Sequence, residues 1–140
     1  MKVCALRAGQ AAEAARALEE VQRLEARVGL IGGSPFYSQG FERYLYAGLM
    51  ESQGRLDDAV RWYGSFSSNS IFDFIYLAPS HLQRARILQR LGRQKEAAEH
   101  YQLALKLYQS SDPEFRPLVE EAEQGLARSG RTGRAVSATR

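Results

Sequence analysis

Residues 82–101 read LQRARILQRLGRQKEAAEHY, and residues 44–63 read YLYAGLMESQGRLDDAVRWY. The two stretches match when Gly92 is aligned with Gly54: a small residue stands seven positions before each glycine, a large apolar residue four before it, an alanine five after it and a tyrosine nine after it. The matching pairs are Ala47 and Ala85, Met50 and Leu88, Ala59 and Ala97, and Tyr63 and Tyr101. Such an internal repeat predicts stacked helical hairpins, because a single hairpin cannot bury its apolar face alone.

The composition fits one compact domain with a neutral body. The chain has 140 residues, of which 44% are hydrophobic, with 19 Lys and Arg against 16 Asp and Glu. Three of these cations, Arg131, Arg134 and Arg140, lie in the last ten residues, which contain no acid. Without them, positive and negative side chains are equal in number over residues 1–130. We therefore expect no nucleic-acid partner, since nucleic-acid-binding domains usually carry a basic face.

The sequence contains no recognisable targeting signal or membrane span. The apolar run from Val3 to Leu6 is broken by Arg7, which makes it too short for a signal peptide. No stretch approaches the roughly 18 apolar residues that a membrane helix needs. The single cysteine, Cys4, cannot form an intramolecular disulfide and fits a reducing compartment. We expect a cytoplasmic protein with no membrane partner.

Apolar periodicity and turn residues divide the chain into predicted helices. Between Gln10 and Val28, apolar residues recur every three or four positions, as on one face of an amphipathic helix. Gly, Pro and Ser then fill the loop before residue 41. The predicted helical-repeat domain covers residues 1–129, with units at about 1–28, 41–66 and 78–108, a capping helix at 113–129 that ends at Gly130, and a disordered basic tail at 130–140.

One connecting segment is unusually apolar. Residues 71–77 read IFDFIYL and precede Pro79, a residue that suits the first turn of a helix. We expect the segment to fold back over the hairpin and extend the core, since an exposed run of this size favours aggregation. The alternative is an exposed aromatic patch for docking a partner.

Residues 92–107, GRQKEAAEHYQLALKL, resemble the second half of a tetratricopeptide repeat, with Ala97, Tyr101 and Ala104 on that family's signature spacing. Residues 54–66 are similar, and residues 9–18 look like a third copy. The resemblance covers roughly residues 2–108. It implies an all-α fold, a right-handed superhelical array of antiparallel helix hairpins with about three units, closed by a C-terminal capping helix.

The spacing between repeats departs from the family. The turn glycines Gly9, Gly54 and Gly92 are 45 and 38 residues apart, against a family norm of 34. Only eight residues precede Gly9, about 12 Å of helix. We therefore expect upstream repeats or a second copy of the chain, as in a homodimer, to cover the first helix. The stretch from Arg61 onward also resembles the terminal repeats of large bacterial multidomain regulators, such as kinases and transcription regulators.

The residues that could carry catalysis or hold a metal are few and scattered. His81 and His100 lie on different predicted helices, and neither an HExxH nor a CxxC pattern occurs. Residues 29–34 are glycine-rich but lack the lysine and preceding strand of a phosphate-binding loop. We expect no catalytic residue, no cofactor and no metal.

The arginines of the helix after Pro79 are the first candidates for partner binding. Arg86, Arg90 and Arg93 follow one helical stripe. In tetratricopeptide arrays the first helix of each hairpin lines the concave groove, so the resemblance places Arg86 and Arg90 there. Arginines in a groove could hold carboxylates of a partner with two hydrogen bonds each. The alternative is that they pair with Glu96, Glu99 or a neighbouring helix.

The equivalent stripe of the middle unit contains Phe41, Tyr44 and Gly48. Phe41 and Tyr44 could form an aromatic shelf for an apolar anchor of a partner peptide, although helical aromatic stripes more often belong to the core. The carboxylate clamp of chaperone-binding relatives uses an asparagine where this chain has Gly48, so we do not expect that particular function.

These observations predict a non-catalytic protein–protein interaction module. Its concave groove, with Phe41, Tyr44, Arg86 and Arg90, would receive a peptide or helix of a partner protein. The alternative is a C-terminal regulatory or assembly segment of a larger signalling protein whose active domain lies upstream.

Overall fold

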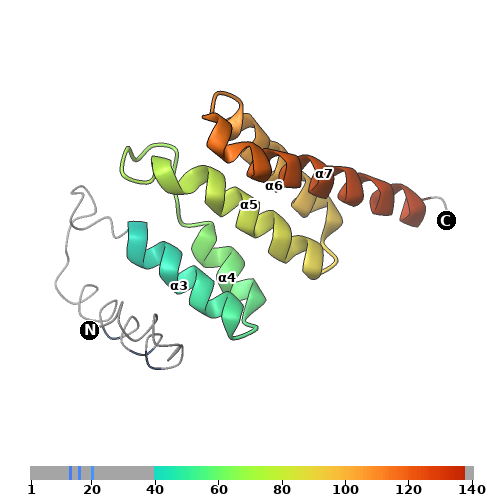
Figure 1. Cartoon of the computed structure of the whole chain (residues 1–140). Coiled ribbons are helices and arrows are strands. Elements are labelled where there is room, and N and C mark those ends of the chain that lie inside the picture. Colours follow the sequence, from blue (N-terminus) through green and yellow to red (C-terminus); the bar gives the residue numbers. More distant parts are fainter. Residues whose placement is uncertain (1–12, 14–15, 17–19, 21–39, 138–140) are drawn as a thin grey trace. The chain divides into compact units, whose positions relative to one another are not determined.

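The computed structural model describes residues 13, 16, 20 and 40–137, with side chains up to residue 130 (Figure 1). The elements in this part are α3 (Gly40–Ser52), α4 (Leu56–Tyr63), α5 (Phe74–Arg90), α6 (Gln94–Tyr108), the short 3-10 helix η1 (Pro113–Phe115) and α7 (Arg116–Ser137). No strand occurs among the described residues, so the predicted all-α class is confirmed. Residues 13, 16 and 20 are helical, but the remainder of the helix predicted at 10–28 lies outside the described residues.

The chain forms two compact units, Met1–Trp62 and Tyr63–Arg140. In the first unit, α3 is joined to α4 by a turn at Gly54, whose φ is 74°. The amide of Gly54 donates to the Glu51 carbonyl at 3.0 Å and that of Arg55 to the Met50 carbonyl at 2.9 Å. This pair of hydrogen bonds is a Schellman motif, which ends a helix at a left-handed glycine.

The second unit repeats this turn between α5 and α6. Gly92 has a φ of 75°, and the amide of Arg93 donates to the Leu88 carbonyl at 2.9 Å. Side chains on both sides of the two turns are buried at equivalent positions. These buried residues are Ala47, Met50, Ala59 and Tyr63 around the first turn, and Ala85, Leu88, Ala97 and Tyr101 around the second. The hairpins predicted at 41–66 and 78–108 are therefore confirmed, while the unit predicted at 1–28 lies mostly outside the described residues and the stacking into a right-handed superhelix stays a prediction.

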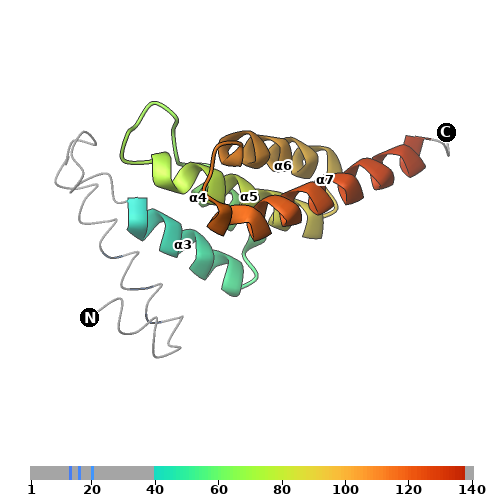
Figure 2. The same cartoon turned by 45° about the horizontal axis from the view of Figure 1, so that its top comes forward.

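Helix α7 packs along the α5–α6 hairpin, mainly against α6 (Figure 2). The two helices approach closely at Gly125, where the Tyr101 ring of α6 occupies the space that a side chain on α7 would need. Ala122 of α7 is also fully buried. In the second unit, small residues such as Ala122 and Gly125 thus let α7 pack closely on Tyr101, while Leu82, Ile87 and Leu88 contribute large apolar side chains to the core.

Two helix boundaries differ from the sequence predictions. α5 begins at Phe74 and contains Pro79 in its interior, because Leu77 is buried and Tyr76 stacks on Phe66 at 5.3 Å. α7 continues to Ser137, so the predicted end at Gly130 is wrong. A glycine inside a helix costs about 1 kcal/mol relative to alanine, which does not by itself end the helix. The other predicted domain limits stay predictions.

None of the helices in the described part of the chain is long and apolar enough to cross a membrane.

Candidate functional site

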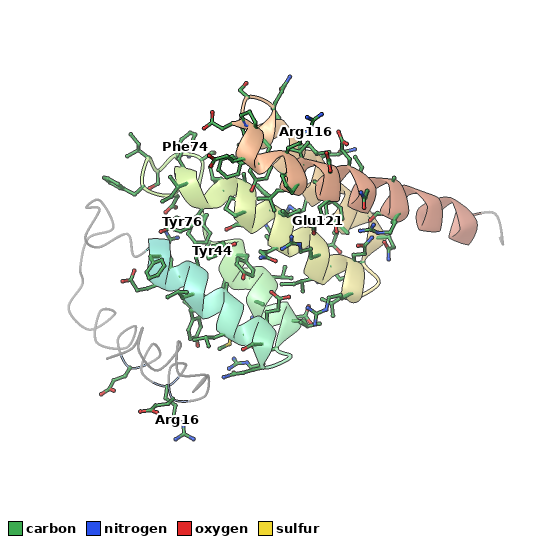
Figure 3. All side chains as sticks on the ribbon, viewed as in Figure 1. Arg16, Tyr44, Phe74, Tyr76, Arg116 and Glu121 are labelled. Carbon is green, nitrogen blue, oxygen red and sulfur yellow. The ribbon has the colours of Figure 1, made fainter. Side chains whose placement is uncertain are left out.

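Arg86, the first candidate, is held by a carboxylate of the same chain. Its Nε and Nη2 atoms donate to the two Oε atoms of Glu121, each at 2.5 Å, and Nη1 donates to Gln83 Oε1 at 3.0 Å. Glu121 lies on α7 (Figure 3). The Arg86 and Glu121 side chains are 33% and 36% exposed. The hydrogen bonds from Arg86 lower the pKa of Glu121 and outweigh the opposing effect of burial. Pairing with a neighbouring helix, the alternative considered from sequence, is therefore what Arg86 does in this state.

A second polar link joins α5, α6 and α7 beside this ion pair. The Tyr101 hydroxyl donates to Gln89 Oε1 at 3.1 Å, and Gln89 Nε2 donates to Ser129 Oγ at 3.4 Å. Burial raises the pKa of Tyr101 although the nearby Arg128 lowers it. The face that α5 shares with α7 is therefore ordered by hydrogen bonds as well as by packing.

The other two arginines of the stripe differ from Arg86. Arg90, in the last turn of α5, is exposed. Arg93 donates from Nε and Nη2 to Glu96 at 2.7 and 2.5 Å, which forms an ion pair at the start of α6. Arg90 is thus the arginine of this stripe that combines an exposed position with a place on α5.

The aromatic candidates lie on α3, in the first unit. Phe41 is 50% exposed, so the interpretation of this residue as core is wrong. Tyr44 is half-buried, and Gly48 follows it one turn later with intermediate exposure. A large exposed ring on a well-formed helix is suited to contact an apolar group of a partner.

The segment at residues 71–77 is also more exposed than the sequence analysis expects. Ile71, Phe74 and Ile75 are 76%, 57% and 74% exposed, while Leu77 alone among the apolar residues of the segment is fully buried. The loop before α5 is held by Asp73, whose Oδ2 accepts from the Ser67 amide at 3.0 Å. The expectation that the whole segment joins the core is therefore wrong: its first turn presents apolar side chains to the surface.

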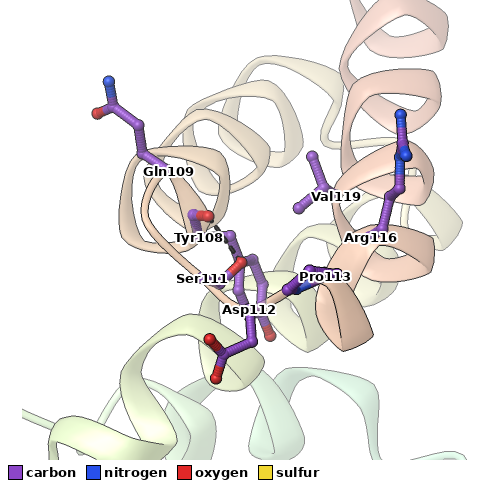
Figure 4. A pocket seen from close by; sticks show the side chains of 7 residues that line it. All are labelled: Tyr108, Gln109, Ser111, Asp112, Pro113, Arg116 and Val119. Atoms are coloured by element: carbon purple, nitrogen blue, oxygen red, sulfur yellow. Dashed lines mark hydrogen bonds between the residues drawn. The ribbon is translucent and has the colours of Figure 1, made fainter.

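A shallow cavity of about 320 Å³ lies where α6 passes into α7 (Figure 4). Its lining consists of Tyr108, Gln109, Ser111, Asp112, Pro113, Arg116 and Val119. Ser111 Oγ donates to the Tyr108 carbonyl at 2.8 Å, which fixes the turn, and Arg116 pairs with Glu120 at 3.6 Å. The side chains around the cavity therefore stabilise the turn between α6 and α7, and they do not form a set of converging reactive groups. Among the described residues, no three His, Cys, Asp or Glu side chains cluster as metal ligands would.

The Arg86–Glu121 ion pair gives a testable stability effect. Arg86→Glu places two carboxylates face to face and is expected to lower the free energy of unfolding by about 1–2 kcal/mol, after allowance for screening of these partly exposed groups. The double variant Arg86→Glu, Glu121→Arg restores opposite charges and should recover most of the loss. Urea unfolding of the three proteins measures this, and a double variant no more stable than the single one would contradict the pairing.

The family model described as "Tetratricopeptide repeat" matches residues 78–111. The matched range takes in most of α5, the turn at Gly92 and all of α6. No curated protein and no solved structure shows significant similarity to the chain.

Proposed function

Since residues 78–111 match the tetratricopeptide repeat, we propose that this chain is a non-catalytic module that binds a peptide or helix of a partner protein. Tetratricopeptide repeats are typically interaction modules, and the hairpin at residues 78–111 is the observation that carries the proposal. The residues that we propose contact the partner are Phe41 and Tyr44 on α3, in the first unit, and Arg86 and Arg90 on α5, in the second unit.

The chemistry of these side chains indicates what the partner carries. Guanidinium groups hold carboxylates with two hydrogen bonds, and Arg86 already holds the Glu121 carboxylate in this way. Arg90 lies one turn after Arg86 on α5 and is exposed. We therefore expect an acidic side chain of the partner to contact Arg90 rather than Arg86. Phe41 would receive an apolar anchor, so the expected partner segment combines an acidic residue with an apolar one.

The proposal is tested by capture of partners from an extract of the source cells. The chain is immobilised, and the captured proteins are compared by mass spectrometry for wild type, Phe41→Ala and Arg90→Glu. The matched control is Lys95→Glu, which reverses an exposed charge in the first turn of α6, where a carboxylate is favourable for the helix.

We expect a set of proteins that binds wild type and Lys95→Glu, and whose recovery falls at least tenfold with Arg90→Glu and with Phe41→Ala. An unfolding midpoint close to wild type for Arg90→Glu confirms that the fold is retained. If both groove variants capture the same proteins as the control, the assignment of the groove is wrong.

Other features of the proposed function rest on the sequence predictions. These are the cytoplasmic location, the absence of nucleic-acid binding, the homodimer or upstream repeats, and the origin in a larger bacterial regulator. Each stays a prediction.

A further inference from the structure

The two histidines of the chain, which the sequence places on different helices, meet in the structure. His81 of α5 and His100 of α6 approach with their Nδ1 atoms 3.0 Å apart, and their ring centroids are 5.1 Å apart at an interplanar angle of 26°. At this distance one Nδ1 carries a hydrogen and donates it to the lone pair of the other. The contact therefore requires the accepting imidazole to be neutral, so the two rings cannot both be protonated. When both rings are neutral, they adopt opposite tautomers.

The charged groups around the pair come from both helices. Arg84 lies one turn after His81 on α5, half-buried, and its Nε has no hydrogen-bond acceptor. Glu96 lies one turn before His100 on α6, but its carboxylate is held by Arg93 at 2.5 Å. The positive charge of Arg84 acts on both rings and opposes the binding of a proton or a metal cation at the pair.

These surroundings weaken proton binding by both rings. Burial lowers the pKa of His81, and the positive charge of Arg84 lowers it further. Burial, Arg84 and His81 together lower the pKa of His100 to about 4, although Glu96 acts in the opposite direction. At neutral pH the pair is therefore uncharged and hydrogen-bonded.

We propose that His81 and His100 form an acid-sensitive latch between α5 and α6. The first proton can bind Nε2 of the donating ring without breaking the contact. When a second proton binds the accepting Nδ1, the N–H···N hydrogen bond is replaced by two N–H groups that face each other. The attraction between the helices then becomes repulsion, and the hairpin that carries Arg86 and Arg90 loosens. This inference concerns the hairpin itself and does not depend on the proposed partner binding.

The direction of the pH effect follows from linkage. In the unfolded chain both histidines have a pKa near the ordinary value of about 6.5, whereas in the folded chain it is lower. Between these values the unfolded state binds more protons, so the latch stabilises the fold fully above about pH 6.5. The contribution is lost as the pH falls from about 6.5 toward 4.

The latch is tested by urea unfolding at pH 7.5 and pH 5.5, where most carboxylates stay charged. The comparison variant is His81→Asn, His100→Asn, whose side-chain amides can hydrogen-bond across the same gap but do not titrate. In wild type the folding equilibrium constant is expected to fall about tenfold between the two pH values. In the double variant the decrease should be less than about twofold. Equal decreases in the two proteins would overturn the proposal.

An NMR titration of wild type tests the proposal even if the double variant does not fold. At pH 7.5, ¹H–¹⁵N correlations of the imidazoles should show one ring protonated at Nδ1 and the other at Nε2. The His100 signals should titrate near pH 4. The same tautomer in both rings, or two pKa values near the ordinary 6.5, would show that no such latch exists.

Discussion

Replacing Gly125 with valine is expected to lower the free energy of unfolding by about 3 kcal/mol or more. A Cβ at this position would lie 2.5 and 2.6 Å from Cε1 and Cε2 of Tyr101, and nearer still to Cζ. The ring cannot move aside, because Tyr101 is 1% exposed and its hydroxyl is hydrogen-bonded to Gln89. α7 would therefore have to move away from α6. Urea unfolding followed by circular dichroism measures the loss.

Gly130 provides the matched control in the same helix. A Cβ there meets no atom within 4 Å. Gly130→Ala should therefore leave stability unchanged or raise it by up to about 1 kcal/mol through helix propensity. If Gly125→Val and Gly130→Ala have similar effects, the close packing of α7 on Tyr101 is not what holds this helix.

Tyr101→Ala is expected to destabilise the protein by about 4 kcal/mol, because it removes a fully buried ring and leaves a cavity between α6 and α7. Tyr101→Phe keeps the ring and removes only the hydrogen bond to Gln89, so it should cost about 1 kcal/mol. The same urea experiment separates the packing contribution of this residue from its polar one.

The control for Tyr101→Ala is a truncation on the exposed face of α6. Leu107 is 42% exposed, so Leu107→Ala removes less buried surface and should cost less than about 1 kcal/mol. A loss for Leu107→Ala as large as that for Tyr101→Ala would mean that Tyr101 is not the centre of this packing.

The hairpins could be predicted because their determinants are local. Helix α6 spans Gln94–Tyr108, as the apolar periodicity indicates, and Gly92 takes the left-handed conformation that a Schellman turn needs. The aligned small and large residues around the two turns are buried because the two helices of each hairpin pack against each other in the same way. Sequence periodicity predicts such local structure directly, because it follows the repeat of the helix.

Helix ends and surface exposure were less predictable. Pro79 suggests a helix start, but tertiary packing of Leu77 and the Phe66–Tyr76 stack place the start at Phe74. Gly130 likewise lies inside α7, because a glycine costs a helix only about 1 kcal/mol relative to alanine. Apolar composition alone did not distinguish Ile71, which is exposed, from a core residue.

The contacts of the candidate site were the least predictable part. Glu121 follows Arg86 by 35 positions, and His100 follows His81 by 19. Which of these side chains meet depends on the register between packed helices, which no local pattern specifies. The sequence showed the arginine stripe and the two histidines, but their partners required the arrangement of α5, α6 and α7.

The proline inside α5 has a consequence for how adaptable the start of this helix is. Pro79 has no amide hydrogen, so the carbonyl oxygen of Ile75 lacks its usual donor four residues along the helix. The first turn, with the exposed Phe74 and Ile75, is therefore joined to the packed part of α5 by one hydrogen bond fewer. That turn can unwind or tilt at a smaller free-energy cost than the remainder of the hairpin. Its apolar side chains can thus be rearranged while the core beyond Leu77 stays unchanged.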